Sequence, residues 1–521
     1  MSEGLEERNR MKHRRFRMLA IVPAVAGLSI ALSTSASAAP APAGSASGAT
    51  VAAATTTPGT FVKVFSNGSD ALTTEDVQPT SDGGHIALAE TNASGGVGVS
   101  WLLKLDSAGN PQFAEEVGCF KTPPGDSAVG HSLQQTSDGG YIFGGGTIGC
   151  GSKSSPSSAS SGIASAYVVK LDSAGRIAWA KVYDDGVTSS DISQIRQTSD
   201  GGYIAVGAAD NSNGNDLGLA LKLGSTGNVQ WQREFSPSGS TTNVLLNAVR
   251  QTSDGGYITA GQFITSATSN SVGNVLAIKL DSSGQVQWEN GYSNVGTNGT
   301  PVDRETVNAV LQTSDGGYLV GGDWNQTNVS PAPHGGLLLK LDSSGGVQSQ
   351  HAYTGRAPNG DVVGSEINSV SPLSSGGFLL GGAADLVLLD GSGVQLVPYI
   401  AEVDSSFNLT QQNLYTEPAP TGRPLSEDFA GANLLANGGA LAAGFTEDPT
   451  TGLGDLYLVQ TDSTGQVGTN CSNLQPAPAL NNVNPRLAPV NVGLTVQTTI
   501  NAPASSPATV GKVTPTSTPS C

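Results

Sequence analysis

Polar side chains that could bind or act on a ligand recur at two matching places along this chain. One place holds Glu75, His131, Ser193, Asn247, Asn308 and Asn368, and the other, two residues earlier, holds Asp191, Glu366 and Asp428. Carboxylates and amides can bind a polar ligand, and carboxylic acids can also act as general acids and bases. We therefore predict that ligand-binding residues come from the set Glu75, His131, Asp191, Asn308, Glu366 and Asp428.

Other chemistry finds little support in the residue pattern. The histidines at 85, 131, 334 and 351 show no metal-ligand spacing, and the cysteines form no Cys-x-x-Cys pair. No Ser/His/Asp set or pair of catalytic carboxylates can be assembled from the sequence. We assign no catalytic residue and no metal. Trp324 is not part of the repeated sequence pattern described next. It could stack on a sugar or pack over a strand edge.

The elements that position these residues are set by a repeated phrase. Gln-Thr-Ser-Asp-Gly-Gly-Tyr-Ile, or a close variant, occupies residues 78–86, 135–142, 197–204, 251–258 and 312–319, and worn copies lie at 374–379 and 436–441. The copies are 54 to 62 residues apart when the Asp or its substitute is the marker. Seven units at a nearly fixed period predict a repeat architecture.

A second phrase follows in every unit. Lys279-Leu280-Asp281-Ser282-Ser283-Gly284 is an example, and the apolar run before it predicts a strand that is buried on both faces. Both phrases read as tight turns between short strands, because Gly accepts positive φ and Asp can bond its own turn backbone. Each unit then holds four strands, and no helical periodicity follows residue 38.

Four-stranded units repeated seven times predict an all-β fold, a seven-bladed β-propeller of four-stranded blades that spans residues 60–470. An extended β-solenoid is the rival, but solenoid repeats are usually shorter. Residues 61–66 align with a fourth strand that has no first three before it, and the fourth strand of the last unit is polar and short. We predict that residues 61–66 complete the seventh blade and close the ring.

The first phrase resembles the Asp-box turn of sialidases and other propellers. The resemblance implies that Asp82, Asp138, Asp200, Asp254 and Asp315 stabilise turns away from any active site. Calcium is conceivable at these carboxylates, but one carboxylate per turn is far short of a shell of six to eight oxygens.

The second phrase resembles the tryptophan-docking repeat of quinoprotein propellers, with Trp179, Trp231 and Trp288 at the matching position. In that family the Trp locks neighbouring blades together. Quinone-dependent members typically have eight blades and adjacent cysteines, which this chain lacks, so pyrroloquinoline quinone is not expected. Both phrases together resemble secreted bacterial propeller repeat proteins, a resemblance that implies a fold and no activity.

The ends of the chain predict export. Residues 1–38 have the basic region, apolar core and Ala-Ser-Ala site of a signal peptide, which could begin at Met11; an uncleaved membrane anchor is the alternative. Residues 39–59 predict a flexible linker, and residues 471–521 a Pro-, Thr- and Ser-rich tail. Four cysteines in an exported chain predict disulfides, and their order favours Cys119–Cys150 and Cys471–Cys521.

The net charge and the repeats together limit the classes of function that we expect. A net charge of −18 repels nucleic acid and anionic membranes and favours solubility outside the cell. We predict a monomeric, exported, non-catalytic scaffold that binds a protein or a glycan at the cell surface. The alternative is an extracellular polysaccharide hydrolase or lyase that uses Asp191, Glu366 and Asp428.

Overall fold

The computed structural model describes residues 59–67, 70–92, 98–118, 127–148, 164–183, 189–210, 215–237, 242–265, 272–293, 303–326, 334–356, 362–387, 394–415, 428–447 and 453–467, together with 474–476, 480–483, 488–490, 494–497, 504–505, 509–512 and 516–519. These residues belong to one compact unit, Thr56–Cys521. The predicted leader, nearly all of the linker and the four cysteines lie outside the described residues.

The described residues form strands and turns and contain no helix. The strands up to residue 460 are β1 (Phe61–Ser66), β2 (Ala71–Pro79), β3 (His85–Asn92), β4 (Gly98–Leu105), β5 (Pro111–Gly118), β6 (Ser127–Gln135), β7 (Tyr141–Ile148), β8 (Ser165–Leu171), β9 (Ile177–Tyr183), β10 (Ser190–Gln197), β11 (Tyr203–Asp210), β12 (Asp216–Leu223), β13 (Val229–Pro237), β14 (Thr242–Gln251), β15 (Tyr257–Thr265), β16 (Val272–Leu280), β17 (Val286–Ser293), β18 (Asp303–Gln312), β19 (Tyr318–Gln326), β20 (His334–Leu341), β21 (Val347–Arg356), β22 (Val362–Gly364), β23 (Ser369–Pro372), β24 (Phe378–Val387), β25 (Val394–Val403), β26 (Leu409–Tyr415), β27 (Asp428–Leu434), β28 (Ala440–Glu447) and β29 (Gly454–Gln460). Those of the tail are β30 (Leu474–Pro476), β31 (Leu480–Val483), β32 (Ala488–Val490), β33 (Leu494–Gln497), β34 (Ala504–Ser505), β35 (Thr509–Lys512) and β36 (Thr516–Pro519).

The strands pair in antiparallel groups of four, so the prediction of an all-β fold built from four-stranded units is confirmed. The groups are β2–β5, β6–β9, β10–β13, β14–β17, β18–β21, β23–β26, and β27–β29 with β1. The first two groups belong to one ten-stranded sheet, where a single parallel pair, Val99 with Ala128, joins them. The arrangement is propeller-like, and no sheet closes on itself.

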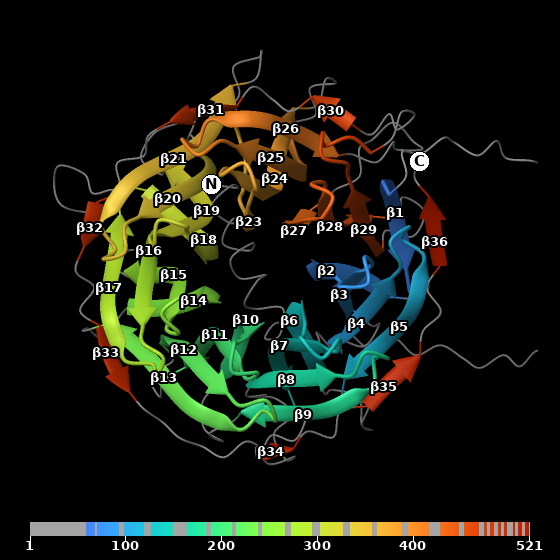
Figure 1. Ribbon diagram of the computed structural model, residues 1–521, viewed down its shortest axis with the longest axis horizontal. Coiled ribbons are helices and arrows are strands. Elements are labelled where there is room, and N and C mark those ends of the chain that lie inside the picture. Colours follow the sequence, from blue (N-terminus) through green and yellow to red (C-terminus); the bar gives the residue numbers. More distant parts are fainter. Residues whose placement is uncertain are drawn as a thin grey trace, which may run out of the picture. The chain divides into compact units, whose positions relative to one another are not determined.

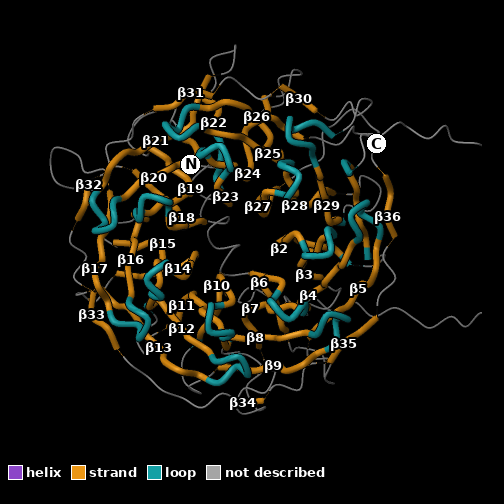
Figure 2. Tube along the Cα trace, viewed as in Figure 1, coloured by secondary structure: helices purple, strands orange, loops and turns teal. Residues whose placement is uncertain are grey.

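The first strands of successive groups lie next to one another. β2 contacts β6, β6 contacts β10, and the series continues through β14, β18, β23 and β27. β27 in turn contacts β2. Figure 1 shows these first strands innermost, and Figure 2 shows the turns that connect the strands of each group.

β1 pairs with the last strand of the repeats, as the alignment of residues 61–66 predicted. Phe61 lies opposite Gln460 and Phe65 opposite Leu456 in the antiparallel register. Phe61, Val62 and Phe65 are buried. The sheet thus unites a strand from residue 61 onward with strands beyond residue 427.

The two repeated phrases are joined by a buried lysine. In the unit of Asp200, Lys222 Nζ lies 2.8 Å from Asp200 Oδ2, while Gly202 N–H and the Thr198 hydroxyl donate to Oδ1. The Lys222 side chain is 3% exposed and the Asp200 side chain 52%. The same pair occurs as Lys104–Asp82, Lys170–Asp138, Lys279–Asp254 and Lys340–Asp315. The turn of one phrase therefore fixes the third strand of its own group.

Aromatic side chains join each group to the next. Trp231 contacts Tyr257 at 5.7 Å between ring centroids, and its Nε1 donates to Ser282 O at 3.2 Å. The ring covers Gly284, whose φ is +78°, so this glycine serves both the turn and the close approach. Phe113–Tyr141, Trp179–Tyr203 and Trp288–Tyr318 repeat the contact. Phe61 on β1 likewise contacts His85 on β3.

One unit lacks the turn glycine, and the unit before it lacks the docking Trp. Phe407 stands where the other units have the turn glycine, and its φ of +63° is unusual for a bulky residue. Ser349 occupies the position of the docking Trp in the preceding group. The Phe407 ring contacts Phe378 at 5.7 Å and His351 at 4.8 Å. The ring thus supplies aromatic packing at an interface where the docking Trp is replaced.

The tail adds a fifth strand to every group. β30 pairs with β26, β31 with β21, β32 with β17 and β33 with β13, and the series continues with β34 on β9, β35 on β5 and β36 on β1. Each pairing is antiparallel and involves the outermost strand of its group (Figure 1). The sequence predicted a Pro-rich tail and did not predict this edge pairing.

We expect deletion of residues 59–67 to lower the melting temperature by several degrees or more. Each of the buried Phe and Val side chains of β1 contributes about 1.5–3 kcal/mol of burial, and the edges of β29 and β36 would lose their partner. Calorimetry of the truncated protein and of a Lys63→Gln control, which changes the same strand at a partly exposed position, checks this. Equal melting of the truncated and full chains would contradict it.

Deletion of residues 474–519 should leave the outermost strands with free backbone donors and acceptors. Open edges pair with other chains, so we expect concentration-dependent self-association. Sedimentation velocity over a range of concentrations measures this, with a chain ending at residue 508 as an intermediate case in which only β35 and β36 are missing. A truncated protein that stays monomeric at all concentrations would show that the tail does not protect the edges.

Candidate functional site

The predicted site residues fall on β-bulges of the innermost strands. The register shifts between Thr74 and Asp76 in β2, and between Gly130 and Ser132 in β6. Corresponding shifts bracket positions 193, 247 and 308 in β10, β14 and β18. A bulge leaves one residue unpaired and re-aims its side chain. Glu75, His131, Ser193, Asn247 and Asn308 are therefore the extra residues.

Three of the predicted residues meet across three groups. His131 Nδ1 lies 3.1 Å from Glu75 Oε2, and its Nε2 lies 3.3 Å from Asp191 Oδ2. The three side chains are partly buried, with exposed fractions of 23% for His131, 18% for Glu75 and 39% for Asp191. Both ring nitrogens therefore face carboxylates.

This geometry favours the charged form of the histidine. Burial alone would lower the pKa of His131, but the carboxylates of Asp191 and Glu75 outweigh it and raise the pKa well above 6.5. A protonated ring that donates from both nitrogens has no lone pair with which to accept a proton. His131 is therefore suited to holding the carboxylates in place and not to acting as a general base.

The asparagines at the bulges bind the neighbouring group. Asn247 Nδ2 donates to Val307 O at 2.8 Å. Asn308 Nδ2 donates to Ile367 O and to Asn368 Oδ1, both at 3.1 Å. These amides connect the innermost strands, so part of the candidate set has a structural use.

The remaining predicted residues lie in the later groups, at or near β19, β23 and β27. Glu366 precedes β23, is partly buried, and donates its backbone N–H to Ala383 O at 2.6 Å. Asp428 begins β27, where its backbone pairs with Phe445. Trp324 is buried in β19 and packs in a hydrophobic cluster.

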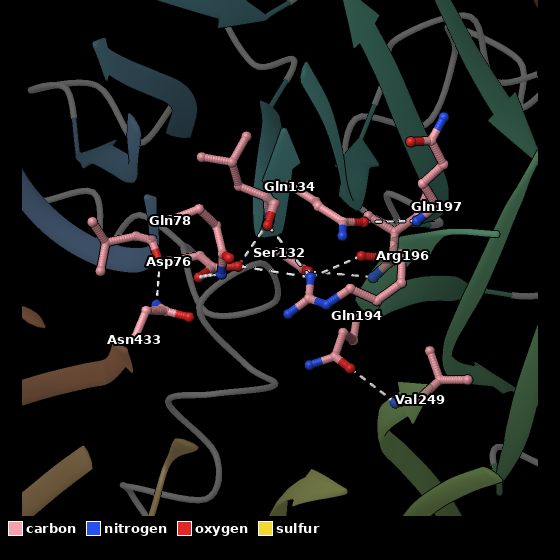
Figure 3. A network of polar contacts seen from close by, with 12 residues as sticks. Asp76, Gln78, Ser132, Gln134, Gln194, Arg196, Gln197, Val249 and Asn433 are labelled. Atoms are coloured by element: carbon pink, nitrogen blue, oxygen red, sulfur yellow. Dashed lines mark hydrogen bonds and ion pairs between the residues drawn. The ribbon is translucent and has the colours of Figure 1, made fainter. Parts of the chain in front are cut away.

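A second polar network lies deeper along the same strands. Asp76 Oδ2 accepts the Leu133 N–H at 2.9 Å and lies 4.0 Å from Arg196 Nη1. Arg196 Nη1 donates to Ser132 Oγ at 2.8 Å, and Gln194 Oε1 accepts the Val249 N–H at 2.9 Å (Figure 3). Sequence reasoning missed these residues. The signal was present, because Arg196 and Arg250 both precede the turn Thr by two residues.

The aspartates of the repeated turns form ion pairs within their own units. Burial alone would raise the pKa of Asp200, but hydrogen bonds from Lys222, Thr198 and Gly202 lower it to about 2. The Lys222 ammonium, 2.8 Å from Asp200 Oδ2, supplies the positive charge beside this carboxylate. Among the described residues no group of three or more His, Cys, Asp and Glu side chains is arranged to hold a metal. In that part of the chain no helix has the length and hydropathy of a membrane span.

The raised pKa of His131 predicts a pH-dependent stability. A folded pKa above the unfolded value of 6.5 gives a contribution that is complete below pH 6.5 and is lost as the pH rises through the folded pKa. The free energy of unfolding of the wild type should fall from pH 6.5 upward relative to that of His131→Asn. Urea denaturation of both proteins at pH 6 to 9 measures the difference, and parallel curves would rule out the charged histidine.

Comparisons with known proteins give no functional relative. No family model and no curated protein matches the chain. Among solved structures, a protein of unknown function from Dyadobacter fermentans DSM 18053 is similar, with a TM-score of 0.40 and 11% sequence identity. The match covers 78% of this chain and 100% of that chain.

Proposed function

We propose that the chain is an exported, non-catalytic binding scaffold: a seven-bladed β-propeller that β1 closes, with its ligand site at the innermost strands. The contact of β27 with β2, the pairing of β1 with β29 and the contact of Phe61 with His85 support the closed ring. The first two contacts join the beginning of the repeats to their end, and the third joins β1, the partner of the last repeat strand, to the first group. In this arrangement the four-stranded groups are the blades.

The observation that carries the binding function is the Glu75–His131–Asp191 cluster. Side chains from three strands converge there, on bulged or near-bulged positions that differ from one unit to the next. Both nitrogens of His131 are committed to the carboxylates, which argues for fixed ligand contacts and against proton transfer. Oxygen atoms of Glu75 and Asp191 held in this way are acceptors for hydroxyl or amine donors.

The composition of the site favours a glycan over a protein as the ligand. Protein interfaces are enriched in large aromatic side chains, above all Trp and Tyr, at the centre of the patch. The bulged positions instead carry Glu, His, Ser and Asn, and Trp324 is buried in the core. Glycan hydroxyls match carboxylate and amide partners. A glycan ligand also agrees with the proposed extracellular location.

Binding should be lost when the acceptors are neutralised. We expect residues 59–521 to bind members of a glycan array, and expect Glu75→Gln combined with Asp191→Asn to weaken that binding about tenfold or more, because hydrogen bonds to charged groups contribute about 1.5–3 kcal/mol each. Calorimetric titration of the glycans that the array selects gives the affinities.

Glu116→Gln, on the outermost strand β5, is the control, since it neutralises a carboxylate away from the innermost strands. Binding unaltered by the double substitution would refute the placement of the site. Release of shorter sugars from a polysaccharide panel would instead establish the hydrolase or lyase, and selective binding to a protein array would establish a protein ligand.

A further inference from the structure

Two arginines occupy matching positions on neighbouring innermost strands. Arg196 in β10 and Arg250 in β14 each lie two residues before the threonine of the turn phrase. The same position holds a neutral side chain in the other groups: Gln78, Gln134, Leu311, Ser371 and Asn433. The two guanidinium groups therefore stand out, because the other groups have no charge at this position and the whole chain has a net charge of −18.

Arg250 donates its hydrogen bonds to uncharged acceptors. Its Nη1 donates to Gln194 Oε1 at 2.6 Å and to Val249 O at 2.8 Å. Gln194 lies two residues from Arg196 on β10, so Arg250 is hydrogen-bonded to the strand that carries Arg196. Arg196 has one carboxylate nearby, Asp76 at 4.0 Å. Within the described residues no carboxylate forms an ion pair with Arg250, and the two arginines share the attraction of Asp76.

The arrangement is electrostatically costly because two like charges are buried beside each other. Burial and the neighbouring charge of Arg196 lower the pKa of Arg250 to about 9, and burial lowers that of Arg196. Buried charges elsewhere in the repeats are compensated: the lysine of each intact unit has its turn aspartate. Arg233 on β13 uses Nε, Nη1 and Nη2 on three carbonyl oxygens.

Donors remain at the arginine pair. In the described part of the structure the hydrogen bonds of Arg196 and Arg250 all come from Nη1. None of their other nitrogens is among the fully buried polar atoms that lack a partner. Nε and Nη2 are therefore available to solvent or to a ligand. Figure 3 shows Arg196 beside Gln194, Ser132 and Asp76.

We propose that Arg196 and Arg250 form an anion subsite that takes a carboxylate or sulfate group of the bound ligand. Paired guanidinium groups present planar N–H donors that match such groups, and the added negative charge would relieve the repulsion between the arginines. The proposal rests on the binding function above and names its ligand class, an acidic glycan.

The spacing fits an oligosaccharide better than a single sugar. Arg196 lies three residues beyond the bulged position 193 in β10, or roughly 10 Å along a strand. A ligand that reaches both the carboxylates of the Glu75–His131–Asp191 cluster and the arginines must bridge this distance. Its hydroxyl groups would lie at the carboxylates and its acidic group at the arginines.

Calorimetric titration with tetragalacturonate, a sulfated oligosaccharide of similar length and neutral maltotetraose tests the subsite. We expect one of the acidic probes to bind the wild type, which distinguishes carboxylate from sulfate. Arg250→Gln should weaken that binding at least tenfold, and Arg250→Lys less. Without ligand, Arg250→Gln should melt at the same temperature or higher, because it removes a repelling charge.

Arg233→Gln is the matched control: it should lower the melting temperature and leave the affinity unchanged. The subsite is wrong if neither acidic probe binds, or if Arg250→Gln binds as the wild type does. Selection of neutral glycans by the array, with no binding of acidic probes, would overturn the subsite and leave the glycan-binding function standing. Failure of all glycans would refute both.

Discussion

The pairing of a buried lysine with a turn aspartate is the interaction on which five of the seven repeats depend. An ammonium such as that of Lys222 is almost fully enclosed, and without a counter-charge its burial would be costly. The aspartate provides the charge from the turn between the first two strands, and it is held there by Thr and Gly donors. The two units that lost the aspartate, with Ser375 and Asn437, have Glu402 and Gln460 in place of the lysine. Both partners are absent together, as the electrostatic argument requires.

With each unit fixed internally, the contacts between units divide into an outer and an inner set. Outside, Trp or Phe rings lie over the turn glycine of the next group and contact its Tyr. Inside, the bulges turn one residue per strand out of the regular pairing. The outer contacts need the same residue types in each unit, whereas the bulged positions are free to differ. The bulged positions and their neighbours carry acidic, amide and histidine side chains, and two arginines lie further along the same strands.

Much of the fold and part of the candidate site could be predicted from the sequence. Two phrases in register predicted four strands per unit, and the likeness of residues 61–66 to a fourth strand predicted their pairing with the last unit. Glu75, His131 and Asp191 were singled out as departures from the repeat, and the structure brings these three together. Asn308 contacts a different neighbour, Glu366 precedes β23, and the side chain of Asp428 lies outside the described part of the structure. The Arg196–Arg250 pair was not predicted, although both arginines precede the turn Thr by two residues.

The sequence by itself determined the units, because period, turn residues and apolar runs are local properties that backbone preferences express within a few residues. Only the tertiary structure decided what lies across the unit boundaries. His131 gains its charge from residues 56 and 60 positions away, and the bulges that direct it leave no local signature. The tail strands pair by backbone hydrogen bonding, which does not depend on side-chain type, so their partners could not be predicted from the sequence. Long-range electrostatics and edge pairing depend on which strands become neighbours, and that is settled only when the groups assemble.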